Sequence, residues 1–172
     1  MKNNRTTNQY FIGIDPGMTG ALVCLDNAGN IRRMIVMPTM KVGAKNKLDP
    51  KAITKWIKNC YTEEEVRMVA IEEQRAMHKQ GVTSTFTTGR GYGILEGIVS
   101  ALELPYEIVR PTDWQREMFR GLPKGKGKDH SKRIAQQLFP KETFKKSERC
   151  TNIHDGLTDA CLLAEYIRRK LK

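Results

Sequence analysis

Residues 11–17 have the sequence FIGIDPG, an apolar run that ends in Asp15 and is followed by the pair Pro16-Gly17. A short apolar run bounded by turn-forming residues is typical of a buried strand. The stretch therefore predicts a strand that carries one carboxylate to its own end. Taken alone, Asp15 could equally belong to an ordinary Asp-Pro-Gly turn.

Acids end two further segments in the same way. The apolar residues 69–71 run directly into Glu72 and Glu73. Near the C-terminus, Asp155 and Asp159 are spaced so that they are offset by only about 40° around a helix. The alternative is that Asp155 caps this helix, Asp159 faces water and the two glutamates are surface residues. Apolar residues on two sides of the helix favour a covered helix instead.

Apolar runs separated by turn-forming clusters predict a mixed α/β fold around one sheet. The predicted strands are residues 11–15, 21–26, 31–37, 68–71 and 106–109, and the predicted helices are residues 50–61, 84–102, 131–139 and 153–171. The first three strands form an antiparallel meander. The first and fourth strands can be neighbours, which would bring Asp15 close to Glu72. Ser131 is expected to cap the third helix.

The predicted helix at residues 84–102 contains four glycines, Gly89, Gly91, Gly93 and Gly97. Each glycine inside a helix costs about 1 kcal/mol relative to alanine. Such a run indicates the close approach of another backbone, from a partner helix or a nucleic-acid strand, or else an irregular loop before a shorter helix.

The chain has 172 residues, which corresponds to a single domain, and residues 1–9 are expected to be flexible. It carries 30 Lys and Arg against 19 Asp and Glu, and the resulting net charge of +11 favours a polyanionic partner. No apolar stretch suits a membrane span or a secretory signal, so we expect a cytoplasmic protein without membrane contact. The four cysteines form no Cys-x-x-Cys pair and are expected to be reduced.

A cluster of carboxylates repels itself unless cations compensate the charge. Sites made only of oxygen suit Mg²⁺, for which Mn²⁺ can substitute. Two such ions can activate a water and stabilise the leaving oxygen of a phosphodiester. The acids and the basic charge together predict metal-dependent hydrolysis of a DNA or RNA backbone, with no small-molecule cofactor.

From Tyr10 to about Arg168, the sequence resembles the RuvC-type Holliday junction resolvases of the ribonuclease H-like superfamily. The segments that resemble its catalytic motifs are IGIDPG at residues 12–17, AIE at 70–72 and DACLLA at 159–164. The segments that resemble the branch containing phage RuvC-like proteins and the plant chloroplast resolvase are MPT at 37–39, AMHKQG at 76–81, RPTDW at 110–114 and GKDHSK at 127–132.

The resemblance implies a ribonuclease H-like fold in one nuclease domain over residues 1–172, with a mixed five-stranded sheet of three antiparallel and two parallel strands flanked by helices. It implies a phage- or bacterium-encoded homodimer that binds a four-way DNA junction and makes paired symmetric nicks. Carried over, the four acidic positions are Asp15, Glu72, Asp155 and Asp159, which would act in catalysis and hold two Mg²⁺ ions.

Two assignments stay open on the sequence. Bacterial RuvC spaces its final acids three residues apart, but position 156 is glycine, so the fourth role falls to Asp155 or to His154. The Ile-Glu pattern points to Glu72 as the second acid, whereas the Glu-Gln pattern points to Glu73. His78 stands where many relatives have proline, which affects the shape of the loop after the second acid.

Residues outside the acids predict a DNA-binding surface. The loop after the second acid is expected to pass over the active site and to read bases. Lys128 and Lys132 resemble a basic residue near the scissile phosphate, whereas Arg90 and Tyr92 suit a phosphate contact and base stacking unless they belong to the dimer interface. The candidate DNA-binding residues are His78, Lys79, Gln80, Arg90, Tyr92, Lys124, Lys126, Lys128 and Lys132.

Three other activities compete with a strict resolvase. A broader branched-DNA endonuclease would cut flaps and forks as well as junctions. A ribonuclease H would act on RNA/DNA hybrids, although the match beyond Gln80 speaks against it. A junction-binding protein without catalysis is disfavoured by acids at all the expected places.

Overall fold

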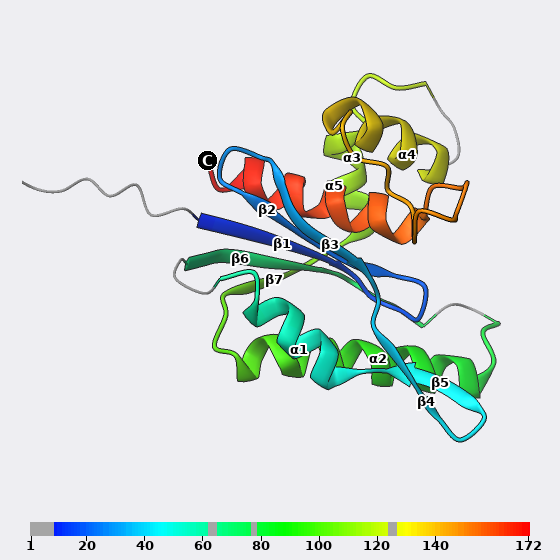
Figure 1. The fold of residues 1–172 in the computed structure, drawn as a ribbon. Coiled ribbons are helices and arrows are strands. Elements are labelled where there is room, and N and C mark those ends of the chain that lie inside the picture. The colour runs from blue at the N-terminus through cyan, green and yellow to red at the C-terminus, as the bar shows by residue number, and fades with distance from the viewer. Residues whose placement is uncertain (1–8, 62–64, 77–78, 124–126) are drawn as a thin grey trace, which may run out of the picture.

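The computed structural model describes residues 9–61, 65–76, 79–123 and 127–172. Its centre is a five-stranded sheet with the strand order β3-β2-β1-β6-β7 (Figure 1). The strands are β1 (Gln9–Asp15), β2 (Ala21–Asp26), β3 (Ile31–Val36), β6 (Glu65–Glu72) and β7 (Tyr106–Val109). The first three pair antiparallel, and β6 and β7 run parallel to β1. This arrangement confirms the predicted mixed sheet, including the pairing of β1 with β6.

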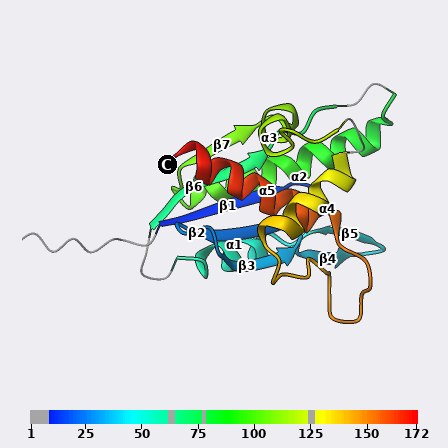
Figure 2. The ribbon, with the colours of Figure 1, turned by 90° about the horizontal axis from the view of Figure 1, so that it is seen from above.

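Five helices cover the two faces of the sheet. They are α1 (Pro50–Lys58), α2 (Val82–Ala101), α3 (Pro111–Met118), α4 (Gly127–Leu138) and α5 (Asp155–Lys170). In Figure 1, α1 and α2 lie on one face, and α5 lies on the other with α3 and α4 beyond it. Seen from above, α5 runs along β1 across the middle of the sheet (Figure 2).

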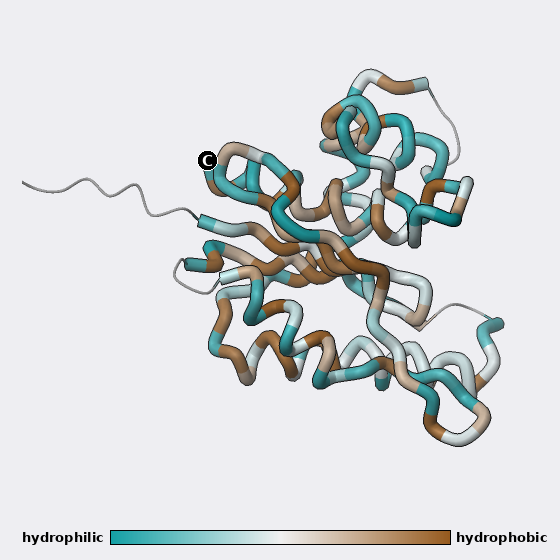
Figure 3. Tube along the Cα trace, viewed as in Figure 1, coloured by the Kyte–Doolittle hydropathy of each residue, from teal (hydrophilic) through white to brown (hydrophobic). Residues whose placement is uncertain are grey.

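Side chains alternate along β1 and supply a separate hydrophobic core on each face. Phe11 packs with α5, α3 and α4, whereas Ile12 and Ile14 pack with α1 and α2. Figure 3 shows hydrophobic residues concentrated along these central strands. Asp15 is four residues after Phe11, so its side chain points to the same face of the sheet. Its carboxylate therefore lies on the face that α5 covers.

Several elements differ from the sequence prediction. The hairpin of β4 (Thr39–Val42) and β5 (Lys45–Leu48) was not predicted because most of its residues are exposed and lack an apolar alternation. The helix α3 was also missed. Residue Gln9 lies in β1 and was wrongly grouped with the flexible N-terminal residues; residues 1–8 lie outside the described part of the chain.

The start of α4 corrects a further prediction. This helix begins at Gly127, so Ser131 is a buried residue inside the helix and not its cap. All four cysteines are free. Among the described residues, no helix combines the length and the apolar character needed to cross a membrane.

Candidate active site

Two of the predicted acids meet at the ends of adjacent parallel strands. Asp15 ends β1 and Glu72 ends β6, and the preceding residues Ile14 and Ile71 are register partners. Because both acids follow the same alternation, they lie on the α5 face of the sheet. Strand pairing therefore brings together two carboxylates that are 57 positions apart in sequence (72 − 15).

A glycine in β1 lets α5 approach the acids closely. A Cβ built on Gly13 would overlap the carbonyl oxygen of Ala160 and lie 2.6 Å from the nitrogen of Ala164. The backbone of α5 therefore rests directly on β1, two residues before Asp15 and on the same face of the sheet. Asp159, which lies beside Ala160, is held against the sheet by this contact.

A second glycine fixes the beginning of α5. A Cβ on Gly156 would lie 2.7 Å from the carbonyl oxygen of Thr19, in the turn that follows Asp15. Position 156 therefore has no room for a carboxylate, which explains why an acid three residues before Asp159 is absent. Asp155, the first residue of α5, supplies the fourth carboxylate at this end of the helix.

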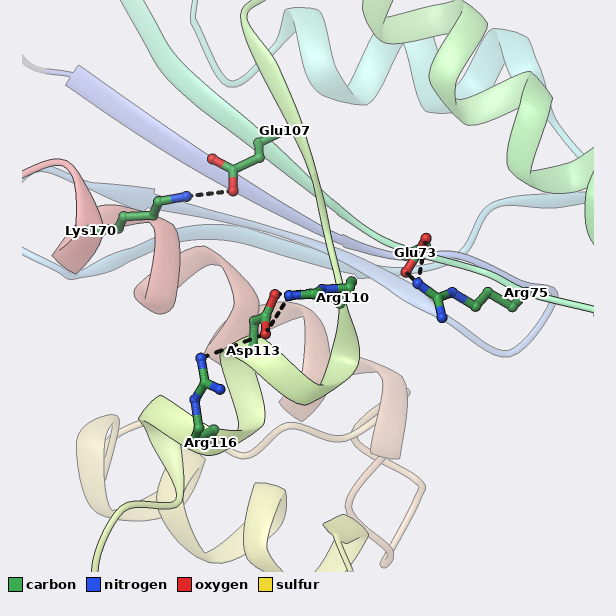
Figure 4. A network of polar contacts seen from close by, with 7 residues as sticks. All are labelled: Glu73, Arg75, Glu107, Arg110, Asp113, Arg116 and Lys170. Atoms are coloured by element: carbon green, nitrogen blue, oxygen red, sulfur yellow. Dashed lines mark hydrogen bonds and ion pairs between the residues drawn. The ribbon is translucent and has the colours of Figure 1, made fainter.

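The structure separates the two adjacent glutamates. Glu73 forms an ion pair of 2.8 Å with Arg75, as Figure 4 shows, and its backbone N–H donates to the carbonyl of Val109. Glu72 is held instead by the indole N–H of Trp114, which donates to its Oε1 at 2.8 Å. Of the two, Glu72 is the acid that faces Asp15 and Asp159.

Burial and mutual repulsion make this cluster electrostatically unusual. Burial, and after it repulsion by the nearby carboxylates of Glu72 and Asp159, together raise the pKa of Asp15 to about 8. Burial likewise raises the pKa of Glu72 and of Asp159. Three carboxyl groups therefore share a site with insufficient positive charge, and a cation would relieve this deficit.

Asp155 differs from the other three acids because lysines neutralise it. The ammonium of Lys132 lies 2.8 Å from one carboxylate oxygen and that of Lys128 lies 3.1 Å from the other. Their hydrogen bonds, that of Lys132 first, hold the pKa of Asp155 below its usual value. The alternative in which Asp155 caps α5 does not hold, since the N-cap residue is His154 and Asp155 is the first residue of the helix.

Two hydrogen-bond donors in the site were missed by sequence reasoning. Trp114 was noted only as part of the segment RPTDW, and Ser131 was expected to cap a helix. Burial raises the pKa of Asp159, and hydrogen bonding by the Ser131 hydroxyl opposes this rise. No spacing rule predicts such contacts, because Trp114 and Glu72 are brought together by α3 packing beside β6. The Nδ1 atom of His154 is buried and has no hydrogen-bond partner among the residues that the structure describes.

The donor set fits a hard divalent cation. The carboxylates of Asp15, Glu72, Asp155 and Asp159 offer oxygens alone, which suits Mg²⁺ or Mn²⁺. As the side chains stand, no group of three or more His, Cys, Asp or Glu residues in the described part of the chain converges closely enough to hold an ion. The lysine pairs of Asp155 are one visible reason, since they engage both of its oxygens.

The predicted DNA-binding residues are spread over several surfaces. Lys128 and Lys132 lie beside the acid cluster, where both form ion pairs with Asp155. Arg90 lines a groove of about 340 Å³ between α2 and the β4–β5 hairpin, on the other face of the sheet. Tyr92 is partly buried beside the loop after β6, near Gln80. Lys79 is exposed, whereas His78, Lys124 and Lys126 lie outside the described residues.

The strand order, the flanking helices and the acids at the ends of β1 and β6 define a ribonuclease H-like fold. No protein-family model matches the sequence, and no curated protein matches it. Solved structures do match over nearly the whole chain. The fold is that of the RuvC-type Holliday junction resolvases.

Three of these structures illustrate the likeness. T. thermophilus RuvC in complex with a Holliday junction substrate has a TM-score of 0.58 at 15% identity, covering 94% of this chain and 96% of that one. A second Thermus thermophilus RuvC structure has a TM-score of 0.51 at 18% identity with the same coverage. The yeast mitochondrial Holliday junction resolvase Ydc2 has a TM-score of 0.58 at 17% identity, covering 95% of this chain and 78% of Ydc2.

Proposed function

We propose that this protein is a Holliday junction resolvase, a metal-dependent endonuclease that binds four-way DNA junctions as a homodimer and makes paired symmetric nicks. The observation that carries the proposal is the partly buried carboxylate cluster of Asp15, Glu72 and Asp159 beside Asp155, in a chain with a net charge of +11. The RuvC-type fold supports the same activity.

The four carboxylates would hold two Mg²⁺ ions, with Mn²⁺ as a substitute. When bound, such ions supply the positive charge that activates water and stabilises the leaving oxygen of a phosphodiester. The net reaction is hydrolysis, in which water adds to phosphorus and one ester oxygen leaves as a hydroxyl. The chain contributes the burial that strengthens these electrostatic interactions.

Lys128 and Lys132 have a second role in the proposal. Their side chains are 73% and 34% exposed, so they can leave Asp155 for the closely spaced phosphates of a DNA backbone. We expect both ammonium groups to turn to DNA phosphates when the junction binds, which frees the oxygens of Asp155 for the cation.

The surface of α2 supports the homodimer. Val82 and Phe86 are 87% and 70% exposed, and a Cβ on Gly89, Gly93 or Gly97 would meet nothing within 4 Å. Glycines four residues apart form one smooth side of a helix, which permits the close approach of a second backbone. An apolar, smooth helix side that is largely exposed in the single chain suits a second copy of α2.

The decisive experiment is cleavage of a synthetic immobile four-way junction in Mg²⁺, beside flap, fork, duplex and RNA/DNA hybrid substrates. We expect paired symmetric nicks in the junction and little cutting of the others. The variants Asp159→Asn and Glu72→Gln should abolish cleavage, whereas the matched variant Glu73→Gln should retain it because Glu73 pairs with Arg75.

Other outcomes would redirect the proposal. Equal cutting of flaps and forks would indicate a broader branched-DNA endonuclease, and cutting of the hybrid would indicate a ribonuclease H. Junction binding with no cleavage in Mg²⁺ or Mn²⁺ would overturn the catalytic function and leave a binding protein.

A further inference from the structure

Neutral donors from the α3–α4 region hold two of the four acids. The indole N–H of Trp114 in α3 donates to Glu72 at 2.8 Å. At Asp159, burial raises the pKa of the carboxyl group, and the hydroxyl of Ser131 in α4 opposes this rise by hydrogen bonding. Trp114 is 1% exposed and Ser131 is 2% exposed. By contrast, the lysines that hold Asp155 are partly or largely exposed and charged.

The charge of a donor decides whether it can remain when a cation binds. An ammonium group neutralises a carboxylate and competes with a metal ion for it. An N–H or O–H orients a carboxylate oxygen but leaves its negative charge available, which is how outer contacts tune metal ligands. Buried neutral donors therefore suit a permanent contact, and exposed lysines suit an exchangeable one.

The position of Trp114 is itself fixed by packing. Its ring meets Phe119 edge-on with centroids 5.6 Å apart, and Phe119 meets the ring of His130 at 5.5 Å. His130 lies in α4, next to Ser131. The aromatic contacts thus tie both donors into one rigid unit that faces the acids. At Glu72, the other oxygen Oε2 accepts a long hydrogen bond of 3.5 Å from the side-chain amide of Gln74.

From this geometry we propose that Trp114 and Ser131 are positioning residues, which orient Glu72 and Asp159 for a divalent cation through neutral hydrogen bonds. The inference rests on the proposed function for the identity of the cation. Neither residue is expected to touch the DNA or the reacting atoms.

The test compares the two tryptophans of the chain. Trp114→Phe keeps an aromatic ring and removes the N–H, whereas the control Trp56→Phe changes a ring in the core on the opposite face of the sheet. By calorimetry on the DNA-free chain, we expect about tenfold weaker Mn²⁺ binding for Trp114→Phe and no change for the control. Half-maximal junction cleavage should likewise need about tenfold more Mg²⁺, with junction affinity unchanged and cleavage recovered at high Mg²⁺.

Two further measurements keep the proposal decidable if Trp114→Phe folds poorly or if the ion binds weakly without DNA. Ser131→Ala removes the second donor with a smaller change in volume, and it should also raise the Mg²⁺ requirement. In the Trp56→Phe background, Trp114 is the only indole, so its emission should shift on Glu72→Gln.

The outcomes separate this proposal from the proposed function. Metal requirements of Trp114→Phe and Ser131→Ala within twofold of the control, or an emission unaffected by Glu72→Gln, would overturn the positioning role while cleavage by the unmodified chain stands. A chain that cuts no substrate would overturn the resolvase, and the calorimetry and emission would still decide whether Trp114 positions Glu72.

Discussion

The two faces of the sheet use the same residue type for opposite purposes. On the α5 face, Gly13 and Gly156 lie against backbone atoms, so any side chain there would collide with α5 or with the turn after β1. On the other face, Gly89, Gly93 and Gly97 of α2 have open space around them. The comparison teaches that one set of glycines closes the acid cluster within the chain, whereas the other set leaves a helix side open to a second chain.

The largest expected effect on stability is on the α5 face of the sheet. Gly13→Ala should lower the free energy of unfolding by about 3 kcal/mol or more, because the added methyl group meets the backbone of α5 and no flexible side chain can move away. Urea unfolding followed by circular dichroism measures this change. A loss below about 1 kcal/mol would mean that α5 does not rest on β1 as described.

The acids held at this face should give the second largest effect. The pKa of Asp15 is raised from 3.8 to about 8 in the folded chain, so the stability it contributes is fully present below about pH 4 and is lost as the pH rises through 8. Without metal, the protein should therefore become less stable across this range. Asp15→Asn should remove much of that loss and stabilise the metal-free chain by about 2 kcal/mol at pH 8.

Thermal unfolding in a chelator at several pH values tests this prediction. The exposed Glu148 offers a matched control, since Glu148→Gln should leave the pH profile unchanged. Added Mg²⁺ should stabilise the unmodified chain at pH 8 more than it stabilises Asp15→Asn. If Asp15→Asn and Glu148→Gln had the same dependence of stability on pH, Asp15 would not lie among like charges.

Changes on the exposed side of α2 should affect dimerisation. Phe86→Glu places a charge on the exposed apolar side of α2, and we expect it to weaken the proposed dimer at least about tenfold while the fold of the chain is retained. Sedimentation at several concentrations measures the change. A dimer that is unaffected would show that another surface holds the two copies together.

The smallest effect distinguishes the two sets of glycines directly. Gly93→Ala adds a methyl group in open space inside a helix and should stabilise the single chain by about 0.5 to 1 kcal/mol, opposite in sign to Gly13→Ala. The measurement is urea unfolding at concentrations where the chain is monomeric. Destabilisation of the monomer would contradict the open surroundings of α2.

Local patterns were sufficient for the central strands and the covered helix. The apolar runs before Asp15 and Glu72 predicted β1 and β6, because a buried strand needs apolar side chains on both faces. The two apolar sides of α5 predicted its burial. Patterns failed at the exposed β4–β5 hairpin and at α3, where packing against the rest of the fold decides the backbone.

The sequence alone could not decide whether Glu72 or Glu73 belongs to the acid cluster. Alternation places adjacent residues on opposite faces, but only the assembled sheet shows which face carries α5. The assignment of Asp155 depended in the same way on the turn at Thr19, which leaves no space for a side chain at Gly156.

The sequence by itself determined the mixed sheet, the acids at the strand ends and the basic character, because these follow from local hydrophobic order and from charge. The tertiary structure decided which carboxylates meet, that the indole of Trp114 holds Glu72, and that lysines neutralise Asp155. The physical reason is that burial, repulsion and hydrogen bonding act through space, between residues that only the packed fold brings together.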